Sequence, residues 1–122
     1  VLAIDSSLAA LAVAAGNVRA AGLSARVRLV AGDLLAPLAS LAGGLDMIVS
    51  NPPYLPTGII PSLPREVAGF EPRLALDGGP DGLRVIRRIV AEAPGLLRSG
   101  GTLLMEIEFK ARYLTLKAKD IV

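Results

Sequence analysis

Residues 50–56, Ser-Asn-Pro-Pro-Tyr-Leu-Pro, place a carboxamide, two prolines and a phenol directly after an apolar run. Proline fixes φ and has no backbone N–H, so the two prolines form a rigid corner whose carbonyls face no competing amide donor. The side-chain oxygen of Asn51 and the carbonyl of Pro52 can therefore accept both hydrogens of a planar NH2 group. Tyr54 can stack on the plane of that group. A rigid turn that ends a strand is the alternative, but the flanking Asn and Tyr favour a binding site.

Two acidic residues also follow apolar runs. Asp5 comes after Val1–Ile4, and Asp33 comes after Gly32. An acid placed as Asp5 is can accept hydrogen bonds from the hydroxyls of a ribose, or it can simply favour the positive end of the next helix. Asp33 can accept from the exocyclic amino group of an adenine, although Gly-Asp is also ordinary turn chemistry. The sequence alone leaves both alternatives open.

The hydrophobic pattern predicts alternating strands and helices. Continuous or alternating apolar runs predict strands, and apolar residues at helical spacing predict helices. The strands are expected at 1–4, 27–31, 45–50 and 102–107, and the helices from Ser6 or Ser7 to Gly22, over part of 34–44, and over 81–97. This order is typical of a doubly wound, mostly parallel α/β sheet.

Ligands of such sheets bind at the carboxyl ends of the strands. Asp5, Asp33 and Asn51 all fall at the ends of predicted strands, so we expect them to converge on one rim. Residues 51–80, which hold most of the prolines, are predicted to be a long irregular stretch. A stretch of that length inside a compact domain is typical of a functional loop.

Composition excludes several classes of chemistry. The 122 residues include no Cys and no His, which excludes disulfides, the usual zinc sites and catalysis by imidazole or thiolate, and no metal site is predicted. No apolar run could span a bilayer and no signal peptide is visible. The net charge of +2 is too small to indicate nucleic acid. These features are compatible with a cytoplasmic protein, and we expect a monomer that binds neither membrane nor nucleic acid.

Several longer stretches resemble one enzyme family. They are "VLAIDSS", "GDLL", "DMIVSNPPY", "EVAGFEPRLALDGGPDGLRVIRRI" and "GGTLLMEI". Over about residues 1–107 the chain resembles the release factor glutamine methyltransferases, S-adenosylmethionine-dependent enzymes with a Rossmann-like class I methyltransferase fold. Asn-Pro-Pro-Tyr alone would also fit DNA adenine and ribosomal RNA guanine methyltransferases. The stretch from Phe70 to Gly82 favours the glutamine enzymes.

The resemblance implies where the cofactor, S-adenosyl-L-methionine, would bind. Asp5 would hold its ribose, and Asp33 with Leu34 would border its adenine. Asn51 would lie beside the methyl donor. Each of these roles comes from the family and is an expectation for this chain.

The resemblance also implies a substrate side. Asn51 and Pro52 would hold the target amide nitrogen, Pro53 would fix the corner, and Tyr54 would pack on the amide. The target would be the glutamine in the Gly-Gly-Gln loop of peptide chain release factors, the expected protein partners. Glu71 would lie in the substrate-side loop, without an assigned role.

The chain also departs from the family pattern. A family strand with a glycine-rich turn that cradles the methionine part of the cofactor should precede Val1, as should a helical N-terminal domain. Residues 108–122 form a divergent tail in which no closing hairpin is expected. We therefore expect residues 1–122 to be a partial catalytic domain that binds the cofactor weakly and is inactive in isolation. N6-adenine methylation of DNA, guanine methylation of ribosomal RNA and an inactive Rossmann-like shell remain as alternatives.

Overall fold

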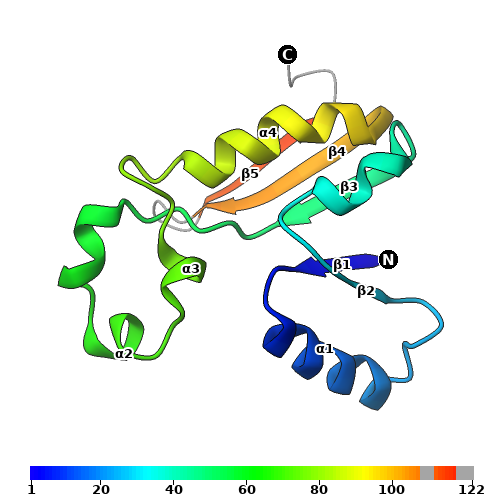
Figure 1. Ribbon diagram of the computed structural model, residues 1–122. Helices are drawn as coiled ribbons and strands as arrows, with labels where there is room; N and C mark the ends of the chain where they lie inside the picture. The colour runs from blue at the N-terminus through cyan, green and yellow to red at the C-terminus, as the bar shows by residue number, and fades with distance from the viewer. Residues whose placement is uncertain (108–111, 118–122) are drawn as a thin grey trace. The chain divides into compact units, whose positions relative to one another are not determined.

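The computed structural model describes residues 1–107 and 112–117, which form two compact units. The first unit is Val1–Leu41 and the second is Ala42–Val122. Each unit contains short strands and helices, and each contains a parallel pair of strands (Figure 1). The chain is therefore an α/β protein with short parallel strands, as the sequence predicts.

The first unit is a strand–helix–strand arrangement. Its elements are β1 (Leu2–Asp5), α1 (Leu8–Ala20), β2 (Arg28–Ala31) and the 3-10 helix η1 (Ala36–Leu41). β1 and β2 are parallel, in a register that places Asp5 opposite Ala31. The predicted order is confirmed, and the short helix expected within 34–44 is a 3-10 helix.

Helix α1 begins where the sequence predicts. Ser7 is its N-cap, and the Ser7 hydroxyl accepts a hydrogen bond from the Ala10 amide at 3.2 Å. Such a cap satisfies a backbone donor that has no partner within the helix. After the helix, Gly22 has a φ of +68°, which a glycine adopts without strain. The cap and the glycine together fix both ends of α1.

The second unit is a three-stranded sheet with a helix on one face (Figure 1). Its strands are β3 (Leu45–Ser50), β4 (Leu97–Ile107) and β5 (Arg112–Lys117), in the order β3-β4-β5, and its long helix is α4 (Arg84–Leu96). The α4 residues that are buried repeat at helical spacing, and they are Ile86, Ile89, Ala93 and Leu96. This periodicity is what makes the segment a helix that packs through one face.

Buried residues of β4 hold the end of β3 in place. Leu103 and Met105 are fully buried, and β4 pairs in parallel with β3 as far as Ser50 opposite Met105. Burying each such side chain contributes roughly 1.5–3 kcal/mol. Asn51, the next residue after Ser50, therefore leaves the sheet from a firmly held strand.

The ends of several strands and helices differ from the predictions, and so does one predicted absence. β4 begins at Leu97, not at 102, because the strand continues through Gly100, whose φ is +77°. α4 begins at Arg84, not at 81, because Gly82 has a φ of +76° and cannot belong to a right-handed helix. The absence of a closing hairpin is also wrong, since β5 pairs antiparallel with β4. Leu114 and Leu116 alternate with Thr115 and Lys117, which suits a strand.

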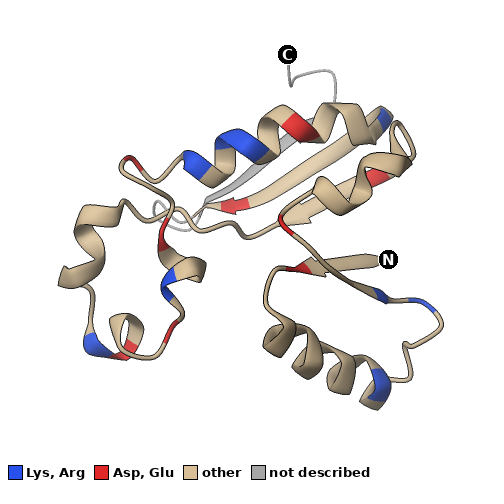
Figure 2. Ribbon diagram, in the orientation of Figure 1, with Lys and Arg blue, Asp and Glu red and all other residues tan. Residues whose placement is uncertain are grey.

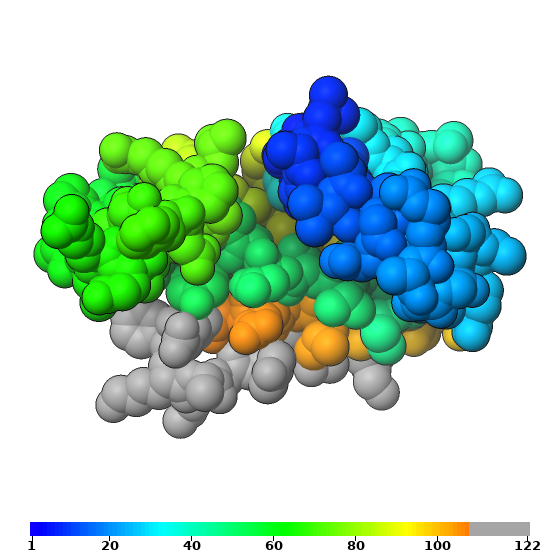
Figure 3. All heavy atoms as spheres, turned by 90° about the horizontal axis from the view of Figure 1, so that it is seen from below, coloured from blue at the N-terminus to red at the C-terminus, as the bar shows by residue number. Residues whose placement is uncertain are grey.

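The segment predicted to be irregular throughout contains three short helices. They are η2 (Thr57–Ser62), α2 (Arg65–Ala68) and α3 (Arg73–Leu76). A proline directly precedes each of them, at positions 56, 64 and 72. Each of these prolines is the N-cap residue, with an extended ψ between 130° and 143°, so it precedes the helix without interrupting its hydrogen bonds. Most side chains of the segment, coloured green in the space-filling view, are exposed (Figure 3).

The described strands pair within each unit, β1 with β2 in the first, and β4 with both β3 and β5 in the second. The doubly wound sheet that would contain all of them stays a prediction. Across residues 1–107 and 112–117, no helix is long and apolar enough to cross a membrane.

Candidate functional site

The two predicted cofactor-binding acids lie at one edge of the β1–β2 pair. Asp5 ends β1 opposite Ala31, the last residue of β2. The Gly32 amide donates to the Asp5 carbonyl oxygen at 3.1 Å, and Asp33 follows directly. The structure thus brings Asp5 and Asp33 to the same edge of the first unit, as expected for the carboxyl ends of neighbouring parallel strands.

The Asp5 carboxylate has one oxygen fixed by the chain. Its Oδ1 accepts from the Ser7 amide at 2.8 Å, which is the helix-starting contact that the sequence left as an alternative role. No hydrogen bond to Oδ2 is present within the described residues. The two roles are therefore compatible, because one oxygen orients the carboxylate and the other is left to accept a hydroxyl.

The backbone around Asp33 is unusual. Leu34 has a φ of +49°, the left-handed region, although it is not a glycine. This conformation costs about 1–2 kcal/mol for an L-residue, and such outliers cluster at functional sites. Gly32 is also constrained, since a Cβ added there would lie 2.1 Å from Cγ of Pro37. The loop that carries Asp33 and Leu34 is therefore closely packed and locally strained.

In the second unit, the corner 51–54 follows β3 directly. The Asn51 side chain is exposed, Pro52 is buried, and Pro53 and Tyr54 are half-buried. An exposed carboxamide on a rigid, partly buried backbone is suited to binding an external group, because its oxygen can be reached and its anchor does not move.

The chain leaves the corner through a short parallel bridge. The Leu55 amide donates to the Leu76 carbonyl at 3.1 Å, and the Gly78 amide donates to the Leu55 carbonyl at 2.9 Å. These two bonds place Leu55 opposite Asp77. Further on, the Thr57 amide donates to the Gly79 carbonyl at 2.9 Å. Residues 76–79 thus hold the backbone immediately after Tyr54.

A turn over residues 78–82, called the glycine turn below, packs against the corner itself. A Cβ added at Gly78 would lie 2.8 Å from the Pro53 carbonyl oxygen, and one at Gly82 would lie 2.3 Å from the Tyr54 carbonyl oxygen. Gly82 also has a positive φ of +76°. Only glycine allows this approach. From the sequence, this stretch was interpreted only as a family signature. Its residues, Gly-Gly-Pro-Asp-Gly, are also typical of a tight turn.

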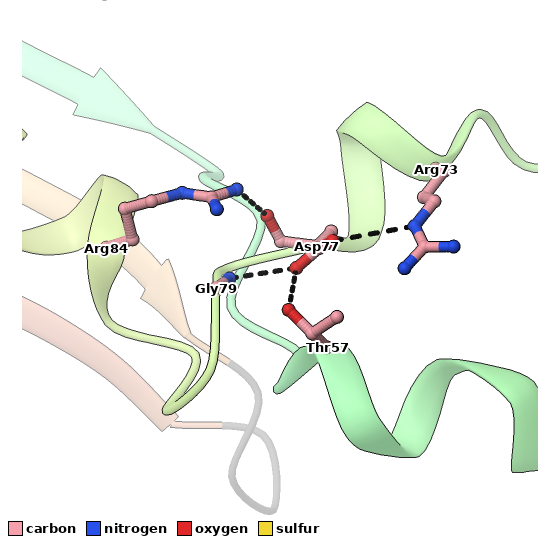
Figure 4. Close-up of polar contacts among 5 residues, drawn as sticks. All are labelled: Thr57, Arg73, Asp77, Gly79 and Arg84. Atoms are coloured by element: carbon pink, nitrogen blue, oxygen red, sulfur yellow. Dashed lines mark hydrogen bonds and ion pairs between the residues drawn. The ribbon is translucent and has the colours of Figure 1, made fainter.

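Asp77 connects the glycine turn to the start of η2 (Figure 4). Its Oδ1 accepts from the Thr57 hydroxyl at 2.6 Å and from the Gly79 amide at 2.9 Å. Its Oδ2 lies 3.5 Å from Nε of Arg73, and its backbone carbonyl accepts from Arg84 at 3.1 Å. The Thr57 hydroxyl, followed by the Gly79 amide, lowers the pKa of Asp77 below its ordinary value. Sequence reasoning assigned no role to this residue.

Asp81 connects the other end of the turn to α4. It accepts from the Leu83 amide at 3.1 Å and forms an ion pair with Arg87 at 2.7 Å. The Leu83 amide, followed by Arg87, lowers the pKa of Asp81. Positive charge gathers along the first half of α4 (Figure 2), and part of it is used in ion pairs within the unit.

The structure therefore assembles two parts of the predicted site separately. Asp5, Asp33 and Leu34 lie at one edge of the first unit, and residues 51–54 form a supported corner in the second. Their convergence on one rim stays a prediction. Glu71 is exposed between α2 and α3, and its role is still unassigned. Among the described residues, no cluster of three or more Asp or Glu side chains could hold a metal ion.

Comparison with known proteins gives a consistent group of relatives. The release factor glutamine methyltransferase of Moorella thermoacetica is 57% identical over 107 residues, which are 88% of this chain and 37% of that protein. That of Thermosynechococcus vestitus is 46% identical over 105 residues, or 86% of this chain and 36% of that protein. The ribosomal protein uL3 glutamine methyltransferase of Bradyrhizobium diazoefficiens is 49% identical over 105 residues, which are 86% of this chain and 32% of that protein. No model of a protein family matches the chain.

The chain spans about a third of the length of these relatives, between 32% and 37%. A match over 88% of 122 residues includes the central residues wherever it begins, and the corner 51–54 is among them. The chain, which matches only part of the length of these proteins, belongs to the family of release factor glutamine methyltransferases.

Proposed function

We propose that this chain carries part of the catalytic domain of an S-adenosylmethionine-dependent methyltransferase that modifies a glutamine side chain, in the Gly-Gly-Gln loop of a peptide chain release factor. The observation that carries the proposal is the 57% identity over 107 residues to a release factor glutamine methyltransferase. The supported corner with its exposed Asn51 adds a physical reason, because it suits the binding of a primary amide.

The corner has a defined task in this reaction. An amide nitrogen is a poor nucleophile because its lone pair is delocalised into the carbonyl. The Asn51 side-chain oxygen and the Pro52 carbonyl would accept its two hydrogens and favour a pyramidal nitrogen, and the Tyr54 ring would pack on the amide. When bound, the cofactor supplies a methyl group on a sulfonium. The nitrogen would gain a bond to the methyl carbon while the carbon–sulfur bond breaks and its electron pair stays on sulfur. The nitrogen would then lose one proton to water, so orientation and electrostatics suffice without a histidine base.

The carbonyls of the corner divide into two sets. Those of Pro53 and Tyr54 lie against Gly78 and Gly82. Pro52 is the proline whose carbonyl the proposal assigns to the substrate, and no backbone amide of the described residues donates a hydrogen bond to it. This difference between the carbonyls supports Asn51 and Pro52 as the acceptor pair.

The first unit has residues that fit the cofactor. The free oxygen of the Asp5 carboxylate could accept from a ribose hydroxyl, and Asp33 with Leu34 could border an adenine at the same edge. An oriented carboxylate and a second acceptor nearby are hydrogen-bond acceptors that suit the hydroxyl and amino groups of an adenosine. The fit rests on Oδ2 of Asp5, to which no described residue donates a hydrogen bond, and on the place of Asp33 at the same edge.

The role of Asp5 can be tested in a chimeric enzyme. In it, the 107 matched residues of this chain replace their counterpart in the Moorella thermoacetica protein. A hydrogen bond to a charged group contributes about 1.5–3 kcal/mol, so Asp5→Ala is expected to raise the cofactor Kd roughly 10- to 100-fold by calorimetric titration. Ser7→Ala is the matched control, since it weakens the start of α1 but keeps the Asp5 carboxylate. Equal Kd values for the two variants would show that Asp5 only caps the helix.

The substrate class is tested with the same chimeric enzyme and radiolabelled methyl donor. Offered a release factor, ribosomal protein uL3 and duplex DNA together, the enzyme is expected to label the release factor fastest. The uL3 arm is a second candidate, because one relative carries that name at 49% identity. Preferential labelling of uL3 would move the assignment to a ribosomal protein. Label in DNA with none in protein would overturn glutamine methylation altogether.

A further inference from the structure

Two of the four residues in the corner 51–54 have no backbone N–H group that could form a hydrogen bond. Pro52 and Pro53 have no N–H, so neither residue can donate a hydrogen bond that would fix its position. The position of the corner must therefore be fixed largely by its neighbours along the chain and by groups packed against it. On its exit side, Leu55 and Thr57 form backbone hydrogen bonds with residues 76–79.

A single carboxylate oxygen connects these elements. Oδ1 of Asp77 accepts from the Thr57 hydroxyl at 2.6 Å and from the Gly79 amide at 2.9 Å (Figure 4). Thr57 belongs to the chain that leaves the corner, and Gly79 belongs to the glycine turn that packs on the corner. The Asp77 side chain is only 15% exposed, so water competes little for these bonds. Removing the carboxylate would free both sides at once.

We propose that Asp77 is a positioning residue of the methyltransferase, which keeps the corner 51–54 in the shape that accepts the substrate amide. The proposal deepens the proposed function and rests on it. Asp77 does not touch the substrate in this account. It acts through the backbone of residues 55–57 and through the glycine turn, which lies against the carbonyls of Pro53 and Tyr54.

Three substitutions in the chimeric enzyme separate positioning from general stability. Asp77→Ala removes both Oδ1 bonds and is expected to lower kcat per folded molecule about tenfold or more, while the cofactor KM changes less than about threefold. Asp77→Asn keeps an oxygen that can accept from Thr57 and Gly79, so it should restore kcat to within about threefold of the unsubstituted enzyme. Thr57→Val removes one of the two bonds and should fall between them.

Asp46 provides the matched control. It is an aspartate of the same unit, in β3, and it forms an ion pair with Arg98. Asp46→Ala therefore loses a carboxylate and an ion pair without touching the corner or the glycine turn. It should leave kcat unchanged. A loss of kcat in Asp46→Ala as large as that in Asp77→Ala would show that the assay reports stability alone.

Hydrogen–deuterium exchange on the same proteins provides a test without activity. Asp77→Ala should speed exchange of the peptide that contains the Leu55 and Thr57 amides, and Asp46→Ala should not. An unsubstituted chimera that transfers no methyl group would defeat the proposed function, yet the exchange result would still stand. Unchanged exchange at residues 55–57, or an unchanged kcat in an active Asp77→Ala enzyme, would overturn the positioning role.

Discussion

Replacing Asn51 by alanine in the chimeric enzyme is expected to lower kcat by roughly two to three orders of magnitude. The substitution removes an acceptor whose bond to the amide strengthens as the nitrogen becomes nucleophilic. Cofactor affinity should fall much less, since the ribose and adenine contacts are assigned to Asp5 and Asp33. Steady-state kinetics with varied cofactor and release factor would separate the two effects.

The exposure of Asn51 allows an effect on turnover to be distinguished from an effect on stability. Replacing an exposed side chain usually changes stability by no more than about 0.5 kcal/mol, and Asn51 is exposed. The melting temperature should therefore hardly move while turnover collapses. Tyr54→Phe, which keeps the stacking surface, should be milder than Tyr54→Ala. A lowered melting temperature with unchanged turnover per folded molecule would mean that the corner is only a structural turn.

The second large effect is expected for Gly82→Ala. The added methyl group would lie 2.3 Å from the Tyr54 carbonyl oxygen, so either the corner or the glycine turn must move. A displacement of about 1 Å at a catalytic group can cost about 10²-fold in rate. We expect a loss of that order in kcat, measured at a temperature at which circular dichroism shows the variant to be folded.

Gly100→Ala is a closely matched control for this experiment. Gly100 has a φ of +77°, almost the same as the +76° of Gly82, but a Cβ there would meet nothing within 4 Å. Both variants incur the backbone cost of a left-handed alanine, about 1–2 kcal/mol. Only Gly82→Ala should also lose turnover. Equal losses of kcat in the two variants would contradict the role given to the glycine turn.

Local signals predicted much of this structure. The hydroxyl of Ser7, the alternation in β2 and the helical spacing of Ile86 and Ile89 each act over a few residues, and each produced the expected element. The three short helices η2, α2 and α3 were not predicted, because the effect of a proline depends on its position relative to a helix. A proline disrupts the interior of an α-helix, but it can stand directly before a helix, as Pro56 does before η2.

The residues of the candidate site likewise include some that local patterns reveal and some that they do not. Asn51 and Tyr54 could be found from the sequence because their residue types carry the chemistry and they are adjacent along the chain. Asp77 could not be found, since its role depends on Thr57, which lies 20 residues away. The contacts of Gly78 and Gly82 with the carbonyls of the corner are likewise long-range. Such pairings follow from packing, which a reading of local patterns does not reach.

The central claim is that the corner 51–54 presents a glutamine amide for methylation. Tandem mass spectrometry of a release factor treated with the chimeric enzyme tests it most directly. The account predicts one added methyl group, on the side-chain nitrogen of the glutamine in the Gly-Gly-Gln loop, and no such product from the Asn51→Ala enzyme. A methyl group on another residue, or equal yields from both enzymes, would contradict it.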